Sequence, residues 1–295
     1  MIRIGTNPIG WSNDDLRELG GATPLETCLS EAHQAGYAGI ELGHKFPRDA
    51  GTLRPVLQAH GLDLVSGWYS ASLRTQSVEA ERAALRPHLD LLKAMGCTVL
   101  VFAETSDAVH GDPALPLSGR PVMPDAEWPD FAARLTELAD AVAAEGVALA
   151  YHHHMGTVVQ TAPEIDRLMA TTGPSVKLLL DSGHATFAGA DPVALARRHH
   201  ARVVHVHCKD VRQAVMQEAL DNDWSFLDAV VAGVFTVPGD GGVDFAAVLS
   251  ELPGYSGWLV VEAEQDPVKA HPLTYALMGF ENLRRFATSA GLLAG

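Results

Sequence analysis

VALAYHHHMGTVVQ, residues 147–160, is the stretch that decides the fold. Its apolar run stops at three consecutive histidines, which is typical of a buried strand whose C-terminal end delivers imidazoles to a site. Because side chains alternate along a strand, His152 and His154 point to one side and His153 points to the other. Isolated core or surface histidines would give the same pattern, so a site is predicted only if other strands end in the same way.

Further apolar runs do end in residues that can bind a metal or transfer a proton. Residues 178–180 are followed by Asp181, with His184 three positions later. The run 203–206 leads into His207, and the run 259–261 leads into Glu262. Such repetition is hard to attribute to packing alone, although a strand-end carboxylate can also cap a following helix.

Strand and helix patterns alternate eight times along the chain, which predicts a parallel (β/α)8 TIM barrel formed as one domain over residues 1–295. A doubly wound open sheet is the alternative, but no Gly-x-Gly-x-x-Gly follows the first strand. In a barrel the C-terminal strand ends face one rim, so Glu41 and Glu104 should join the residues above. The expected strands are residues 1–6, 39–43, 62–68, 98–103, 147–151, 178–180, 203–206 and 259–261, and the expected helices are 24–35, 48–60, 78–95, 126–145, 161–170, 191–199, 244–252 and 267–287.

Capping residues mark several of the helix starts. Asp125 is the expected N-cap of helix 126–145, and Thr161 with Glu164 forms a capping box. Asp191 precedes a proline at the first helical position.

Two connections are too long for simple turns. Residues 105–124 are rich in Gly, Pro, Ser and Asp, which predicts a functional loop over the substrate or at an interface. Residues 211–257 form an insertion with a helical piece near 223–231 and a Gly-rich turn at 238–242.

Composition narrows the class of protein. The hydrophobic fraction of 47% fits an ordinary soluble protein, and the formal net charge of −15 disfavours nucleic acid and anionic membranes as partners. Cys28, Cys97 and Cys208 have no paired spacing, and the sequence starts without an export signal. No apolar run is long enough to span a membrane, so a cytoplasmic location is expected.

The strand-end residues form a mixed nitrogen and oxygen ligand set. Asp181, His207 and Glu262, with either His152 or His154, suit Mn²⁺, Co²⁺, Fe²⁺ or Zn²⁺ better than Mg²⁺.

Lys209 should share a face with His207, because it follows that residue by two positions. It could bind a substrate oxygen or act as an acid or base. The alternative is a rim lysine or an ion-pair partner of Glu262 or Glu104.

Four motifs carry a resemblance over almost the whole chain. Leu-Asp-Ser-Gly-His at 180–184, His-Val-His-Cys-Lys-Asp at 205–210, Pro-Gly-Asp-Gly-Gly-Val-Asp-Phe at 238–245 and Val-Val-Glu at 260–262 resemble the xylose-isomerase-like barrel superfamily. Within it, residues 5–15 and 151–157 resemble the inosose dehydratase family. The resemblance implies removal of water from 2-keto-myo-inositol (scyllo-inosose), giving a trihydroxycyclohexanedione in inositol catabolism. It also implies a divalent metal, usually manganese or cobalt, and a dependence on glutathione.

The chain departs from the superfamily at the fifth strand. A glutamate ligand normally stands there in a Glu-x-His pattern, whereas here His152 takes that place and His154 the histidine position. The resemblance thus implies His152, Asp181, His207 and Glu262 as metal ligands, with the choice between the two histidines left open. Sugar epimerases use a glutamate pair on the fifth and eighth strands for proton exchange, so the loss of one favours elimination.

Roles follow as a hypothesis for the dehydration. A base takes the proton beside the ketone, and an acid protonates the departing hydroxyl. His154 is the first candidate for the base, Lys209 and Glu41 come next, and Glu104 is the candidate acid. Amide, charged and aromatic side chains suit a polyhydroxylated ring, although core packing explains the tryptophans equally well. The candidates for substrate binding are Asn7, Trp11, Lys45, Trp68 and His184.

Other functions stay open on the same scaffold. A ketose isomerase or epimerase is the nearest alternative, and a non-catalytic sugar-binding protein is a further one. A type IV apurinic endonuclease is disfavoured by the acidic charge and by the lack of extra ligands for a trinuclear cluster. Association into a homo-oligomer is a general expectation for such enzymes.

Overall fold

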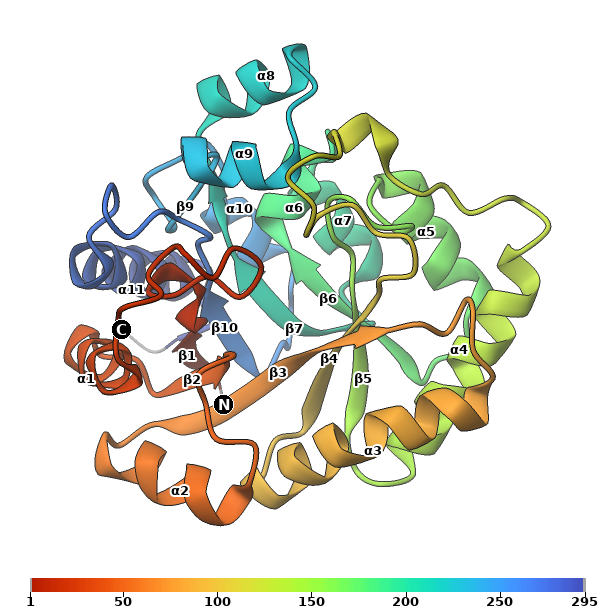
Figure 1. The fold of residues 1–295 in the computed structure, drawn as a ribbon, viewed down its shortest axis with the longest axis horizontal. Coiled ribbons are helices and arrows are strands. Elements are labelled where there is room, and N and C mark those ends of the chain that lie inside the picture. Colours follow the sequence, from red (N-terminus) through yellow and green to blue (C-terminus); the bar gives the residue numbers. More distant parts are fainter. Residues whose placement is uncertain (1, 294–295) are drawn as a thin grey trace.

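A closed barrel of eight parallel strands forms the centre of the molecule (Figure 1). The structure is a computed structural model and describes residues 2–293. Neighbouring strands follow the chain order and the last barrel strand pairs with the first, so the predicted barrel is confirmed and the open-sheet alternative is wrong. The barrel strands are β1 (Arg3–Thr6), β2 (Gly39–Leu42), β3 (Asp63–Ala71), β4 (Val99–Glu104), β5 (Ala148–His152), β6 (Val176–Asp181), β7 (Val203–Cys208) and β10 (Trp258–Val261).

Helices surround the barrel, as Figure 1 shows. None of those within residues 2–293 is long and apolar enough to cross a bilayer. The predicted span 78–95 is the observed one, because Ser77 caps its start and Gly96 ends it with a left-handed φ of 85°. The helices are α1 (Leu25–Ala35), α2 (Ala50–Ala59), α3 (Val78–Met95), α4 (Trp128–Ala143), α5 (Ala162–Thr171), α6 (Ser182–Phe187), α7 (Pro192–His199), α8 (Gln213–Asp221), α9 (Phe226–Ala232), α10 (Phe245–Ser250) and α11 (Pro272–Ser289), with short 3₁₀ turns η1 (Pro8–Gly10) and η2 (Leu117–Gly119).

The capping predictions are confirmed at two helices and wrong at one. The Thr161–Glu164 capping box is present on α5, and Asp191 accepts a hydrogen bond from the backbone of α7. The N-cap position of α4 is Glu127 rather than Asp125. Asp125 instead pairs with Arg167, so its carboxylate is engaged outside the helix start.

The insertion after β7 contains more structure than the sequence indicates. Besides α9, it holds α8 and an antiparallel pair formed by β8 (Asp210–Val211) and β9 (Phe235–Thr236). These elements are too short for a clear apolar period, which explains why the sequence pattern did not reveal them.

A second, smaller hydrophobic cluster lies outside the barrel core. It includes Leu117 from the long loop, Met155 from the turn after β5, and Phe226 and Phe235 from the insertion. Backbone contacts support it, since Leu117 N donates to Trp224 O at 3.0 Å. The long loop and the insertion therefore pack on one another beside the C-terminal rim.

Gly39 on β2 occupies a position with no room for a side chain. A Cβ there would lie 2.7 Å from Trp258 Cη2 and 2.8 Å from Asp63 O. We expect Gly39→Ala to lower the free energy of unfolding by about 1–3 kcal/mol through overpacking, measured by urea denaturation. Gly111→Ala is the control, since nothing lies within 4 Å of its Cβ position. Equal stabilities for the two variants would contradict this account of β2 packing.

Candidate active site

The polar strand ends line one cavity at the C-terminal rim of the barrel. Seven predicted site residues reach it, from the segment after β1 through to the end of β10. Those residues are Asn7, Glu41, Trp68, His152, His154, His207 and Glu262. The cavity also contains Ile9, Asp14, Asp15, Leu42, Val101, His110 and Glu264, which the sequence did not single out.

Three predicted metal ligands form one buried cluster. Donor atoms of Asp181, His207 and Glu262 all lie within 4.8 Å of one another. His207 Nδ1 lies 3.5 Å from Asp181 Oδ2 and forms a short ion-pair contact with Glu262 Oε2. Apart from this contact, neither His207 Nδ1 nor Glu262 Oε2 makes a hydrogen bond within the described residues. Buried imidazole and carboxylate atoms without further hydrogen bonds can act as ligands, so this cluster fits a divalent cation.

The two candidate histidines of the fifth strand differ in what they contact. His152 Nε2 lies 3.4 Å from Asp181 Oδ2, beside the ligand cluster. His154 directs Nδ1 to Met155 O at 2.7 Å. Since a carbonyl only accepts, Nδ1 carries the proton and Nε2 of His154 keeps a free lone pair. The geometry therefore favours His152 as the fifth-strand ligand.

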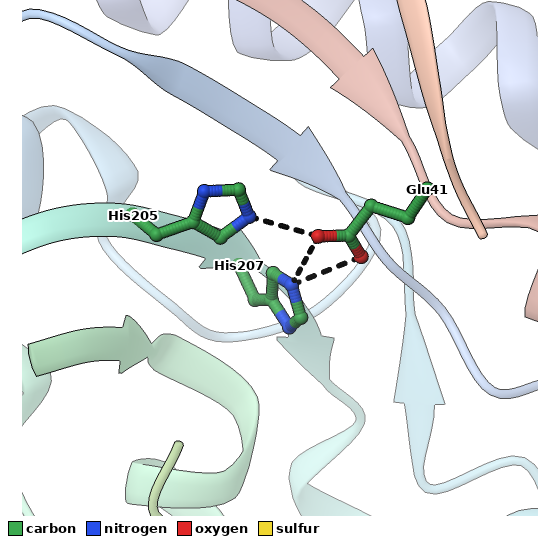
Figure 2. Close-up of side chains that lie close together, drawn as sticks. All are labelled: Glu41, His205 and His207. Atoms are coloured by element: carbon green, nitrogen blue, oxygen red, sulfur yellow. Dashed lines mark hydrogen bonds and ion pairs between the residues drawn. The ribbon is translucent and has the colours of Figure 1, made fainter. Parts of the chain in front are cut away.

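A buried carboxylate orients His207, as Figure 2 shows. Glu41 Oε1 accepts hydrogen bonds from His205 Nε2 at 2.8 Å and from His207 Nε2 at 3.2 Å. Its other oxygen accepts from Asn7 Nδ2 at 2.8 Å. Because Nε2 of His207 is the donor to Glu41, Nδ1 is left to face the ligand cluster.

This network conflicts with the expectation that Glu41 is a base. Both of its oxygens already accept hydrogen bonds. Burial opposes the charge, but His207 and His205 outweigh burial and hold the pKa of Glu41 well below its usual value. No role was predicted for His205, although it lies in the motif at residues 205–210. Its spacing of two from His207 places both side chains on one face of β7.

His154 and His184 lie against each other in the site. Their ring centroids are 3.7 Å apart, and both residues are buried. Burial, followed by the neighbouring His184 and His110, lowers the pKa of His154 well below its usual value. His154 is therefore a neutral imidazole, and its Nε2 can accept a hydrogen bond. His184 lies behind it, with Nε2 3.0 Å from Lys209 Nζ.

Lys209 is a fully buried ammonium among carboxylates. Its Nζ lies 2.8 Å from Glu262 Oε1 and 3.9 Å from Asp181 Oδ2, and it donates to Glu264. Burial disfavours the charge, but Glu262 and Glu264 outweigh this and raise the pKa of Lys209. The lysine therefore stays protonated. This agrees with the ion-pair alternative and conflicts with a base role.

Glu264 is a site residue that the sequence reasoning missed. It lines the cavity, and its buried Oε2 makes no hydrogen bond within the described residues. The signal was present, because Glu264 follows Glu262 by two positions.

Six predicted site residues are not among those that line this cavity. Asp181, His184 and Lys209 contact lining residues, whereas Glu104, Trp11 and Lys45 are held by contacts elsewhere. Glu104 is buried, but it accepts backbone hydrogen bonds from Ser106 at 2.9 Å and Arg74 at 3.2 Å, which is a capping arrangement. Trp11 donates to Glu31 at 2.7 Å.

Lys45 donates to three backbone carbonyls, of which Thr23 O is nearest at 2.6 Å. These contacts hold local chain segments together, so we leave Glu104, Trp11 and Lys45 out of the site.

Comparisons with known proteins agree with the barrel fold. The family model for xylose isomerase-like TIM barrels matches residues 29–286. The rhizopine catabolism protein MocC of Rhizobium meliloti is 56% identical over 98% of this chain and 90% of its own. An inosose dehydratase of Geobacillus thermodenitrificans is 45% identical over 96% of each chain. A solved IolI protein with a bound zinc atom has a TM-score of 0.66 at 16% identity, covering 99% of this chain and 100% of that one, and shows the shared fold.

Proposed function

This chain belongs to the xylose isomerase-like TIM barrel family, and we propose that it removes water from 2-keto-myo-inositol with the help of a divalent cation. Its identity of 45% to one curated inosose dehydratase and 42% to another, over nearly the whole chain, identifies it as an enzyme of the hydro-lyase class. The observation that carries the metal-dependent part is the buried cluster of Asp181, His207 and Glu262, in which His207 Nδ1 and Glu262 Oε2 have no hydrogen-bond partner besides their contact with each other.

His152, Asp181, His207 and Glu262 are the residues that would hold the cation. A divalent cation there supplies a Lewis acid that polarises a ketone and makes the neighbouring C–H bond more acidic. Two imidazoles and two carboxylates suit Mn²⁺ or Co²⁺, which we propose as the working metals. Glutathione dependence stays a prediction from the resemblance alone.

The surrounding side chains supply proton transfer and substrate binding. His154 is our candidate base, because it is neutral and its Nε2 is free to accept the proton beside the ketone. As the C–H electrons form the new double bond, the hydroxyl leaves with its own bonding pair and takes up the proton that His154 accepted, which releases water and restores the neutral imidazole. Glu264 offers its free Oε2 to a substrate hydroxyl, and Trp68 gives an apolar face.

A second candidate is a step in rhizopine catabolism. The relative named for that process has the higher identity, 56% against 45% for the dehydratase of Geobacillus thermodenitrificans. This observation makes rhizopine a necessary second compound in any activity test.

Incubation with 2-keto-myo-inositol, a ketose or rhizopine in D₂O separates the candidates. We expect the conjugated dione absorbance to grow only with 2-keto-myo-inositol, together with loss of water by mass spectrometry. Deuterium exchange into the ketose without water loss would replace the dehydratase with an isomerase. Consumption of rhizopine alone would favour the second candidate.

Glu41→Gln tests whether the hydrogen-bonded carboxylate positions His207. The amide nitrogen cannot accept a hydrogen bond, so we expect the affinity for Mn²⁺ to fall about 10-fold to 100-fold in a chelator-competition titration. Glu31→Gln is the control, because Glu31 accepts from Trp11 outside the site. Wild-type affinity in Glu41→Gln would remove this positioning role.

A further inference from the structure

The long loop between β4 and α4 delivers a histidine to the cavity. His110 lines the cavity, and the residue before it donates from Val109 N to Gly156 O at 2.9 Å. The loop approaches the turn after β5 so closely that a Cβ on Gly156 would lie 2.9 Å from His110 N. Gly156 also has a left-handed φ of 78°, so glycine suits this position on two grounds.

The rest of the loop is fixed in the folded protein. Arg120 forms an ion pair with Glu164 at 2.8 Å, and both side chains are mostly buried. Pro116 pairs with Ser225 of the insertion, and Leu117 packs in the second hydrophobic cluster. The position of His110 is therefore fixed by contacts of the residues that precede it and of the residues that follow it in the loop.

The imidazole of His110 has aromatic neighbours and an unused polar atom. Its ring centroid lies 4.9 Å from that of His154 and 6.3 Å from that of Trp68. Nδ1 is buried and makes no hydrogen bond within residues 2–293. Burial lowers the pKa of His110, so the ring is neutral and offers one donor and one acceptor. A buried polar atom without a partner is costly, and a bound ligand could relieve that cost.

We propose that His110 is a substrate-binding residue that hydrogen-bonds a ring hydroxyl of a polyhydroxylated ketone beside His154. This inference rests on the proposed function and deepens it. His110 sits on the loop rather than on the barrel strands that hold the metal-ligand cluster. The loop therefore sets which polyol ring the enzyme accepts, while the strands supply the chemistry.

The test compares steady-state kinetics of wild type, His110→Phe, His110→Asn and Asp112→Asn with 2-keto-myo-inositol. Phenylalanine keeps the ring and removes the polar atoms, so we expect KM to rise about 10-fold to 100-fold with kcat within about threefold of wild type. His110→Asn should recover part of the loss, because its amide can donate and accept. Asp112→Asn changes an exposed residue of the same loop and should match wild type.

Each other outcome overturns the proposal. Unchanged KM in His110→Phe, or a loss in kcat alone, removes the binding role. An equal loss in Asp112→Asn would show that the loop as a whole was disturbed. If the wild-type enzyme leaves 2-keto-myo-inositol unchanged, the proposed function itself is wrong. If the wild type is active and His110→Phe has the same kinetics, only the role of His110 is wrong.

Discussion

Replacement of Asp181 with asparagine is expected to lower the affinity for Mn²⁺ by at least about 100-fold and to abolish dehydration. Asp181 Oδ2 faces both His152 Nε2 and His207 Nδ1, so its charge lies at the centre of the ligand cluster. Asp181 Oδ1 caps α6 by accepting from His184 N at 2.8 Å. Asparagine is an equally good cap, so the fold should survive. Chelator competition measures the affinity, and circular dichroism checks the fold.

The matched control is the same substitution at another helix cap. Asp191 Oδ1 accepts from Val193 N at 2.9 Å at the start of α7, on the exposed surface. Asp191→Asn should keep wild-type affinity for the metal. If Asp181→Asn bound Mn²⁺ as tightly as this control, Asp181 could not be a ligand.

Replacement of Lys209 with methionine is expected to lower the free energy of unfolding of the metal-free protein by about 3–5 kcal/mol. The ammonium faces Glu262, Glu264 and Asp181, and all four side chains are buried. Methionine fills a similar volume but leaves the buried carboxylates without their positive partner. Urea denaturation of the metal-stripped protein measures the loss.

A surface lysine provides the comparison for this variant. Lys93 pairs with Glu145 at 2.7 Å with both side chains partly exposed, so Lys93→Met should cost only about 0–1 kcal/mol. Stability losses of equal size in the two variants would mean that Lys209 does not balance the carboxylates.

The barrel and the ligand cluster could be predicted because both depend on local periodicity. Apolar runs identify the strands, and parallel pairing then places every C-terminal strand end on one rim. This is why Asp181, His207 and Glu262 were found from sequence positions far apart. The ion pair of Lys209 with Glu262 was one of the alternatives for this lysine, and it follows from the same rule.

The direction of several side chains could not be predicted, because long-range packing decides where they point. Glu104 ends a barrel strand as the ligands do, yet its carboxylate turns to the backbone of Ser106 and Arg74. Lys45 is held by carbonyls of a neighbouring loop. His110 reaches the cavity on a loop that contacts the turn after β5 and packs on the insertion after β7, and no local pattern encodes these contacts.

The most direct test is a spectrophotometric assay of metal-stripped protein with 2-keto-myo-inositol, before and after addition of Mn²⁺. Our account predicts no change without metal, growth of the conjugated dione absorbance once Mn²⁺ is added, and no growth in Asp181→Asn. Dehydration at the same rate in stripped and Mn²⁺-loaded protein would contradict the central claim that the cluster of Asp181, His207 and Glu262 acts through a bound cation.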